Sequence, residues 1–144
     1  MLRLLVLAGS LATSATAALA SPAVSLASAV FVERNTPTRG HLLEPASRLS
    51  RGDRVVYVVN WSRMGGNGGF TVTNPLPHSV YYQESADGDE EVSIDGGRTW
   101  GRLGDLHVGS REATPEDVTH VRWRIASARA AQGSGQIAYS AIVR

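Results

Sequence analysis

The chain has 144 residues, with 14 basic and 13 acidic side chains, no cysteine and 42% hydrophobic residues. That length fits one domain, and the nearly balanced charge provides no basic surface for holding nucleic acid. The lack of cysteine excludes disulfides, thiolate zinc sites, iron–sulfur clusters and cysteine nucleophiles. The hydrophobic fraction is high enough for a folded core.

Residues 1–20 have the pattern of a cleaved signal peptide. Arg3 precedes the apolar run at 4–8, small residues follow, and the segment ends in Ala-Leu-Ala at 18–20. This order of a positive charge, an apolar region and a small-residue cleavage site is typical of export signals. The apolar run is too short for a membrane-spanning helix, and no later segment is longer. We therefore expect a mature protein that begins near Ser21, has no membrane span after signal cleavage, and is exported to the periplasm, cell surface or medium.

Residues 21–144 are predicted to form a single all-β domain. Apolar and polar residues alternate with a period of two, and turn residues interrupt them roughly every ten positions, which indicates short strands. The strongest candidate is 54–61, where Val55, Tyr57, Val59 and Trp61 share one face. The other expected strands are 24–32, 70–73, 80–83, 91–94 with a hairpin partner at 99–103, 121–125, and 137–143. About seven or eight such strands fit an immunoglobulin-like β-sandwich.

Several motifs in the same order strengthen that expectation. They are G-D-x-V-x-Y at 52–57, V-T-N-P-L-P at 72–77, V-Y-Y at 80–82, V-R-W-R-I at 121–125 and G-Q-I-A-Y at 135–139. Together they resemble the conserved-repeat domain of unknown function 11 (the DUF 11 family) of bacterial and archaeal surface and secreted proteins, over about 45–144. The resemblance implies an immunoglobulin-like β-sandwich outside the cytoplasm with no known catalytic residues. The family often occurs in tandem copies, whereas this chain carries one.

A second motif, S-x-D-G-G-x-T-W, occupies 93–100. It resembles the Asp-box of sialidases and related propellers, in which the aspartate bonds to the turn backbone and the tryptophan packs on a β-hairpin. A propeller needs several four-stranded blades, and this chain is too short for them. We therefore predict a structural hairpin formed by Ser93, Asp95, Gly96, Gly97 and Trp100.

An acidic cluster lies beside this motif, and its weak calcium-ligand candidates are Asp87, Asp89, Glu91 and Asp95. Calcium takes about six to eight oxygen ligands, but the spacing here differs from that of a helix-loop-helix calcium loop. A solvated acidic loop is the simpler interpretation. The alternative is a calcium- or glycan-binding module that uses loop 87–95 with the nearby aromatic residues Tyr81, Tyr82 and Trp100.

No recognised catalytic constellation or cofactor motif is present in the sequence. We therefore predict a protein that is not an enzyme, uses no cofactor and has a structural or protein-interaction role. Its expected partners are envelope or surface proteins, or a second copy that pairs with the last strand, 135–144. That strand ends with the chain and is expected to form a free sheet edge, which is open to pairing with another strand.

Overall fold

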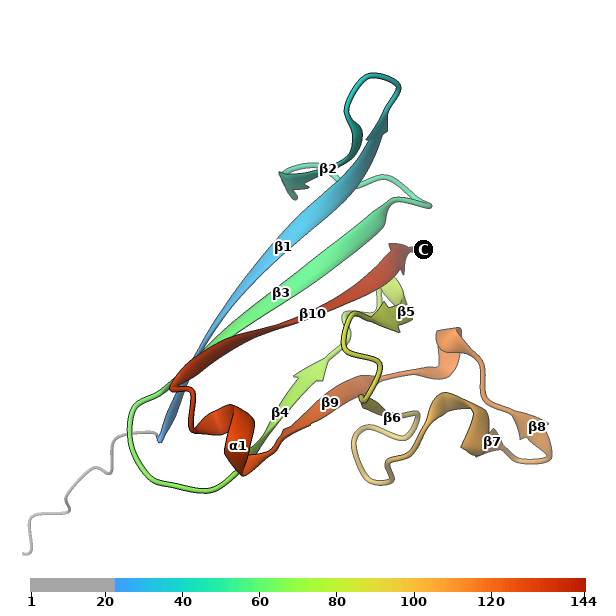
Figure 1. The fold of residues 1–144 in the computed structure, drawn as a ribbon. Coiled ribbons are helices and arrows are strands. Elements are labelled where there is room, and N and C mark those ends of the chain that lie inside the picture. The colour runs from blue at the N-terminus through green and yellow to red at the C-terminus, as the bar shows by residue number, and fades with distance from the viewer. Residues whose placement is uncertain (1–22) are drawn as a thin grey trace, which may run out of the picture.

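The regular structure is almost entirely antiparallel β-strand in the computed structural model, which describes residues 23–144 (Figure 1). The five-stranded sheet has the order β2 (Gly40–Pro45), β1 (Val24–Thr36), β3 (Arg54–Arg63), β10 (Ser134–Val143) and β5 (Val80–Ser85). The three-stranded sheet has the order β4 (Phe70–Pro75), β9 (His120–Ile125) and β6 (Glu91–Ser93). The prediction of an all-β fold is confirmed, whereas the predicted signal peptide at 1–20 lies outside the described residues.

The remaining elements are short. A two-stranded ribbon joins β7 (His107–Val108) to β8 (Arg111–Glu112), and the helical turns are η1 (Leu103–Asp105), η2 (Pro115–Asp117) and α1 (Ser127–Ala130). None of the helices within residues 23–144 has the length and apolar character needed to cross a membrane.

One hydrophobic core joins the two larger sheets. Alternation places every second side chain of a strand on the same face, so β3 sends Val55, Val59 and Trp61 to this inner face. The predicted alternation of β9 is also confirmed, because Val121, Trp123 and Ile125 are buried while Arg124 is exposed. The buried cluster comprises Val55, Val59, Trp61, Val72, Leu76, Val80, Tyr82, Val92, Val118, Val121, Trp123, Ile125, Ala130, Ile137, Tyr139 and Ala141.

The last strand is not a free edge, so that expectation was wrong. β10 lies between β3 and β5, and Tyr139 is opposite Tyr57 on one side and Ser85 on the other. The position of a strand in the chain does not determine its place in a sheet, because pairing is a tertiary choice. Here β5, from the middle of the sequence, pairs with the side of β10 that faces away from β3.

Two further differences concern local pairing. β2 was not predicted, because Gly40–Pro45 has no clear alternation and ends in a proline. It forms because β1 runs on to Thr36, past the predicted end, and turns back on itself. The expected return strand at 99–103 reduces to a single bridge between Val92 and Gly101.

Candidate functional site

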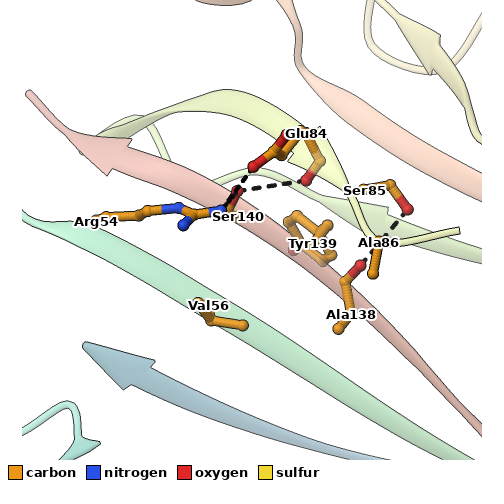
Figure 2. A pocket seen from close by; sticks show the side chains of 8 residues that line it. All are labelled: Arg54, Val56, Glu84, Ser85, Ala86, Ala138, Tyr139 and Ser140. Carbon is orange, nitrogen blue, oxygen red and sulfur yellow. Dashed lines mark hydrogen bonds and ion pairs between the residues drawn. The ribbon is translucent and has the colours of Figure 1, made fainter. Parts of the chain in front are cut away.

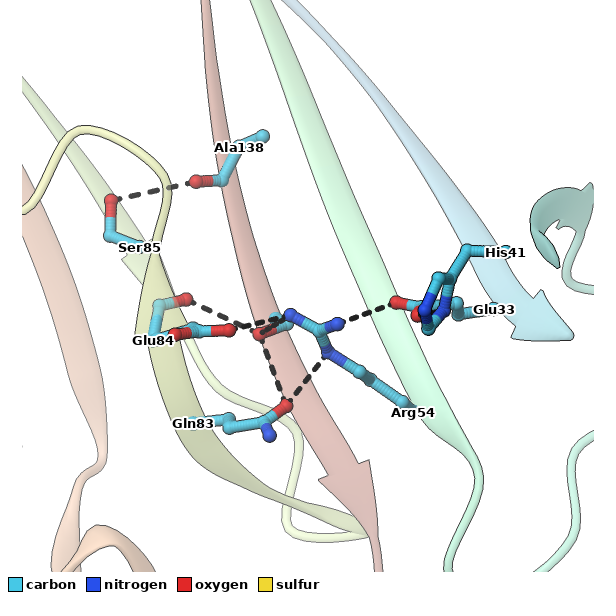
Figure 3. Close-up of polar contacts among 8 residues, drawn as sticks. Glu33, His41, Arg54, Gln83, Glu84, Ser85 and Ala138 are labelled. Carbon is cyan, nitrogen blue, oxygen red and sulfur yellow. Dashed lines mark hydrogen bonds and ion pairs between the residues drawn. The ribbon is translucent and has the colours of Figure 1, made fainter. Parts of the chain in front are cut away.

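The outer face of the five-stranded sheet, opposite the core, carries a polar network centred on Arg54 (Figure 3). Its guanidinium donates to Glu33 at 2.6 Å, to Glu84 at 2.6 Å and to the side-chain oxygen of Gln83 at 2.9 Å. A longer bond of 3.3 Å reaches the Ser140 hydroxyl. One arginine therefore links β1, β3, β10 and β5 across the face of the sheet.

A β-bulge explains how two consecutive residues of β5 reach the same arginine. Successive side chains of a regular strand point to opposite faces, but the β5–β10 register shifts between Ser140 and Ala141. An extra residue in one strand bends it and re-aims its side chains. Gln83 and Glu84 consequently both bond to Arg54, and Ser140 is buried beneath them at 3% exposure.

The network extends to the edge strand β2. His41 Nδ1 lies 2.5 Å from Glu33 Oε1, while the other oxygen of that carboxylate accepts the bond from Arg54. At the neighbouring position of β1, Arg34 donates to Asp53 at 3.0 Å. These contacts fasten the β1–β2 hairpin to the start of β3.

The geometry of Ser140 is not that of an activated nucleophile. Its hydroxyl donates to the Gln83 amide oxygen at 3.2 Å and accepts from Arg54. A nucleophilic serine needs an adjacent general base, usually a histidine. In residues 23–144 the hydroxyl contacts no such base, so its bonds hold strands β3, β5 and β10 together.

A shallow cavity of about 270 Å³ opens beside the network. Figure 2 shows its lining, which comes from β3, β5 and β10 and comprises Arg54, Val56, Glu84, Ser85, Ala86, Ala138, Tyr139 and Ser140. Charged groups lie at one end, and the small side chains of Val56 and Ala138 form the other. The cavity therefore lies at the boundary between the polar network and the apolar part of the outer face.

Apolar side chains continue from the cavity along the outer face. The strand registers place Phe31 opposite Val56, and Val58 between Ala29 and Ala138. With Ala27 they form what we call the outer strip: Ala27, Ala29, Phe31, Val56, Val58 and Ala138. All six are exposed or half-buried, and none carries a charge. An apolar surface with polar neighbours is the usual anatomy of a protein-binding face.

The outer face of the three-stranded sheet differs, because the loop of the S-x-D-G-G-x-T-W motif covers part of it. Asp95 accepts from the Ser93 hydroxyl at 2.8 Å, from the Thr99 backbone at 2.9 Å and from the Thr99 hydroxyl at 2.7 Å. These bonds, led by those from Thr99, hold the pKa of the Asp95 carboxyl well below its usual range. Gly97 donates its backbone N–H to the buried Ser93 hydroxyl, and its carbonyl accepts from the Trp100 indole at 2.9 Å.

Trp100 then covers part of the sheet. The Arg122 guanidinium lies 4.4 Å from the centre of its ring, and the His120 ring meets it edge-on. Gly96 and Gly97 have positive φ angles of 77° and 87°, which only glycine adopts without strain. The motif thus forms a loop that is internally bonded and docked on β9, closed by the Val92–Gly101 bridge.

The calcium-ligand candidates are not gathered into one site. Asp87 pairs with Arg129, Asp89 is exposed, and Asp95 is occupied by its own loop. Glu91 accepts hydrogen bonds from Arg122 and Arg124. The bond from Arg122 contributes most, and the two together lower the pKa of the Glu91 carboxyl. Across residues 23–144, no group of three or more histidine or carboxylate side chains is placed to hold a metal ion.

The aromatic residues expected beside the acidic loop are also dispersed. Tyr82 is buried, and its hydroxyl donates to Glu90. Burial is the main reason that the pKa of the Tyr82 hydroxyl is raised, and the bond to Glu90 raises it further. Tyr81 lies beside the guanidinium of Arg144, while Trp100 lies beside Arg122. Within residues 23–144, these three rings therefore do not form one exposed platform.

Sequence reasoning missed the Arg54 network, and the available signal was weak. Arg54 opens an apolar strand, and its partners come from three other strands. A lone charge at a strand end is usually solvated, and only the assembled sheet shows that it meets two carboxylates.

Comparison with known proteins gives no match to a family model, to a curated protein or to a solved structure.

Proposed function

We propose that the protein is an exported, non-enzymatic module that binds another polypeptide through the outer face of its five-stranded sheet. The outer strip is the observation that carries the proposal. A solvent-facing sheet surface is ordinarily polar, because alternation puts apolar residues on the core side. Here Phe31, Val56 and Val58 are apolar although they lie on the outer face, away from the core and beside the cavity at Arg54.

The sequence supports the setting of this module. The leader-like segment at 1–20 points to export to the periplasm, cell surface or medium. The motif resemblance and the core shared by two antiparallel sheets support an immunoglobulin-like β-sandwich of the conserved-repeat family. Such a domain would work in a bacterial envelope or as a secreted protein, with an envelope or surface protein as its partner.

The network around Arg54 supports binding rather than catalysis. Its groups bond to one another across strands β1, β3, β5 and β10, which favours a preorganised surface beside them. A preformed surface loses less conformational entropy on association than a flexible one. The network therefore acts as a polar rim at one end of an apolar contact area.

The test is in-cell cross-linking of the tagged protein, followed by mass spectrometry of the envelope fraction. Val58→Glu puts a charge at the centre of the outer strip, and we expect at least a tenfold loss of the main cross-linked species. Thr71→Glu is the matched control, because Thr71 is exposed on the outer face of the three-stranded sheet. Equal cross-linking in the wild type and both variants, with unchanged melting temperatures, would contradict the proposal.

A further inference from the structure

Part of β1 has a partner on only one side. β3 pairs with β1 over Val24–Val32, whereas β2 pairs with it only over Phe31–Thr36. Just before that, the Ala46 N–H donates to the Val30 carbonyl at 3.1 Å. On the side away from β3, no strand in the described part of the chain pairs with residues 24–29, which we call the β1 open edge.

The direction of the free backbone groups follows from two bonds. The Val30 carbonyl turns away from β3 to meet Ala46, and the Ala23 carbonyl turns toward β3 to accept from Met64 at 2.8 Å. Backbone groups alternate sides along a strand. Val24, Leu26 and Ser28 therefore direct their N–H and C=O groups into the open side.

This edge lacks the usual protection against pairing. Natural edge strands carry charges, prolines or bulges that deter a further strand. The other edges of the two larger sheets have them: β2 and β4 each end in a proline, β5 is bulged, and β6 begins with the charged Glu91. Residues 24–32 contain neither a charge nor a proline, and Leu26 is 50% exposed.

We propose that the β1 open edge pairs antiparallel with the same edge of a second copy of this chain. This proposal concerns the sheet edge rather than the outer strip, so it goes beyond the proposed function and does not depend on it. The available stretch runs from Ala23 to Ala29, before Ala46 closes the edge at Val30, so Leu26 lies at its centre. A twofold axis at Leu26 puts this residue opposite Leu26 of the partner subunit, and Val24 opposite Ser28 of the partner subunit.

This register uses every free backbone group of the edge. Val24, Leu26 and Ser28 all fall in hydrogen-bonded pairs, each of which exchanges both N–H···O bonds. No like charges meet across the axis, and the two exposed leucines cover one another. The result joins two five-stranded sheets into one continuous sheet, an isologous arrangement in which the same patch serves both subunits.

The first measurement is the molar mass of the exported protein over a concentration series, by sedimentation equilibrium. We expect the wild type to approach twice the monomer mass. Leu26→Pro removes an N–H that faces the open side and leaves the β3 pairing intact, so this variant should fold and remain a monomer. Leu43→Pro is the matched control. Leu43 is 48% exposed, and the β1–β2 register turns its N–H to the outside of the edge strand β2, so this variant should still dimerise.

Leu26→Lys covers the case in which the proline variant unfolds, because it puts two like charges on the twofold axis and should also give a monomer. A wild type that stays monomeric at all concentrations overturns the proposal, as does a dimer that survives both Leu26 variants. A monomeric wild type whose cross-links still depend on Val58 overturns the dimer and leaves the proposed function standing. A dimer with cross-links insensitive to Val58→Glu supports the β1 pairing and contradicts the outer strip.

Discussion

The two sheets share one core but differ in how their outer faces are completed. On the three-stranded sheet, the loop at 93–100 covers β9 with Trp100, and Glu91 pairs with Arg122 and Arg124. On the five-stranded sheet, the polar network is confined to one end, and the outer strip is left uncovered. The outer face of the three-stranded sheet is partly covered by its own loop, whereas the outer face of the five-stranded sheet retains apolar area. This difference is the reason for proposing the five-stranded sheet as the binding surface.

The largest effect should come from breaking the contact between the two sheets. Trp123 is 1% exposed, lies 5.3 Å from the Tyr139 ring and donates its indole N–H to Ser85. We expect Trp123→Ala to lower the free energy of unfolding by about 3–5 kcal/mol. Trp100→Ala is the comparison on the outer face, and it should cost less than half as much. Urea denaturation measures both, and equal losses would mean that the outer loop is as important to the fold as the core.

A smaller loss should follow from crowding the inner face of the five-stranded sheet. A Cβ atom added at Gly135 would lie 2.4 Å from the Trp61 ring, which is fully buried. Gly135→Ala should therefore cost about 1–3 kcal/mol by overpacking. Gly65→Ala is the control, because its added Cβ meets no atom within 4 Å. A Gly135→Ala protein as stable as this control would show that Trp61 packs elsewhere.

The smallest effect should come from loosening the loop that covers the three-stranded sheet. The bonds to Asp95 lower its pKa in the folded state, so its contribution is complete above the unfolded value of about 4 and is lost as the pH falls below it. Asp95→Asn should lower the melting temperature by a few degrees at pH 7, and the gap from the wild type should narrow below pH about 4. Asp89→Asn, at an exposed neighbouring position, should show no such gap. A gap that stays constant down to low pH would contradict the role of the Asp95 carboxylate.

The sequence predicted the elements whose signals are local. The alternation in 54–61 and 121–125 identified two central strands and their buried faces, because burial on one face imposes a period of two. The S-x-D-G-G-x-T-W residues identified a turn, and most of its bonds in the structure join residues within 93–100, while Thr119 adds bonds to Ser93 and Gly96.

Strand order and the exposed apolar strip were decided only by the tertiary structure. The place of β10 inside the sheet depends on β5, which is more than forty residues away in sequence. The sequence predicted an open edge at the last strand, whereas the structure has one at the first strand. Arg54 became the centre of a network only because sheet pairing and a bulge brought Glu33, Gln83 and Glu84 to it. Periodicity records which face of a strand is buried, but it carries no information about which strands become neighbours. That choice rests on packing and pairing between distant segments, and it determined that the outer strip and one side of β1 are exposed.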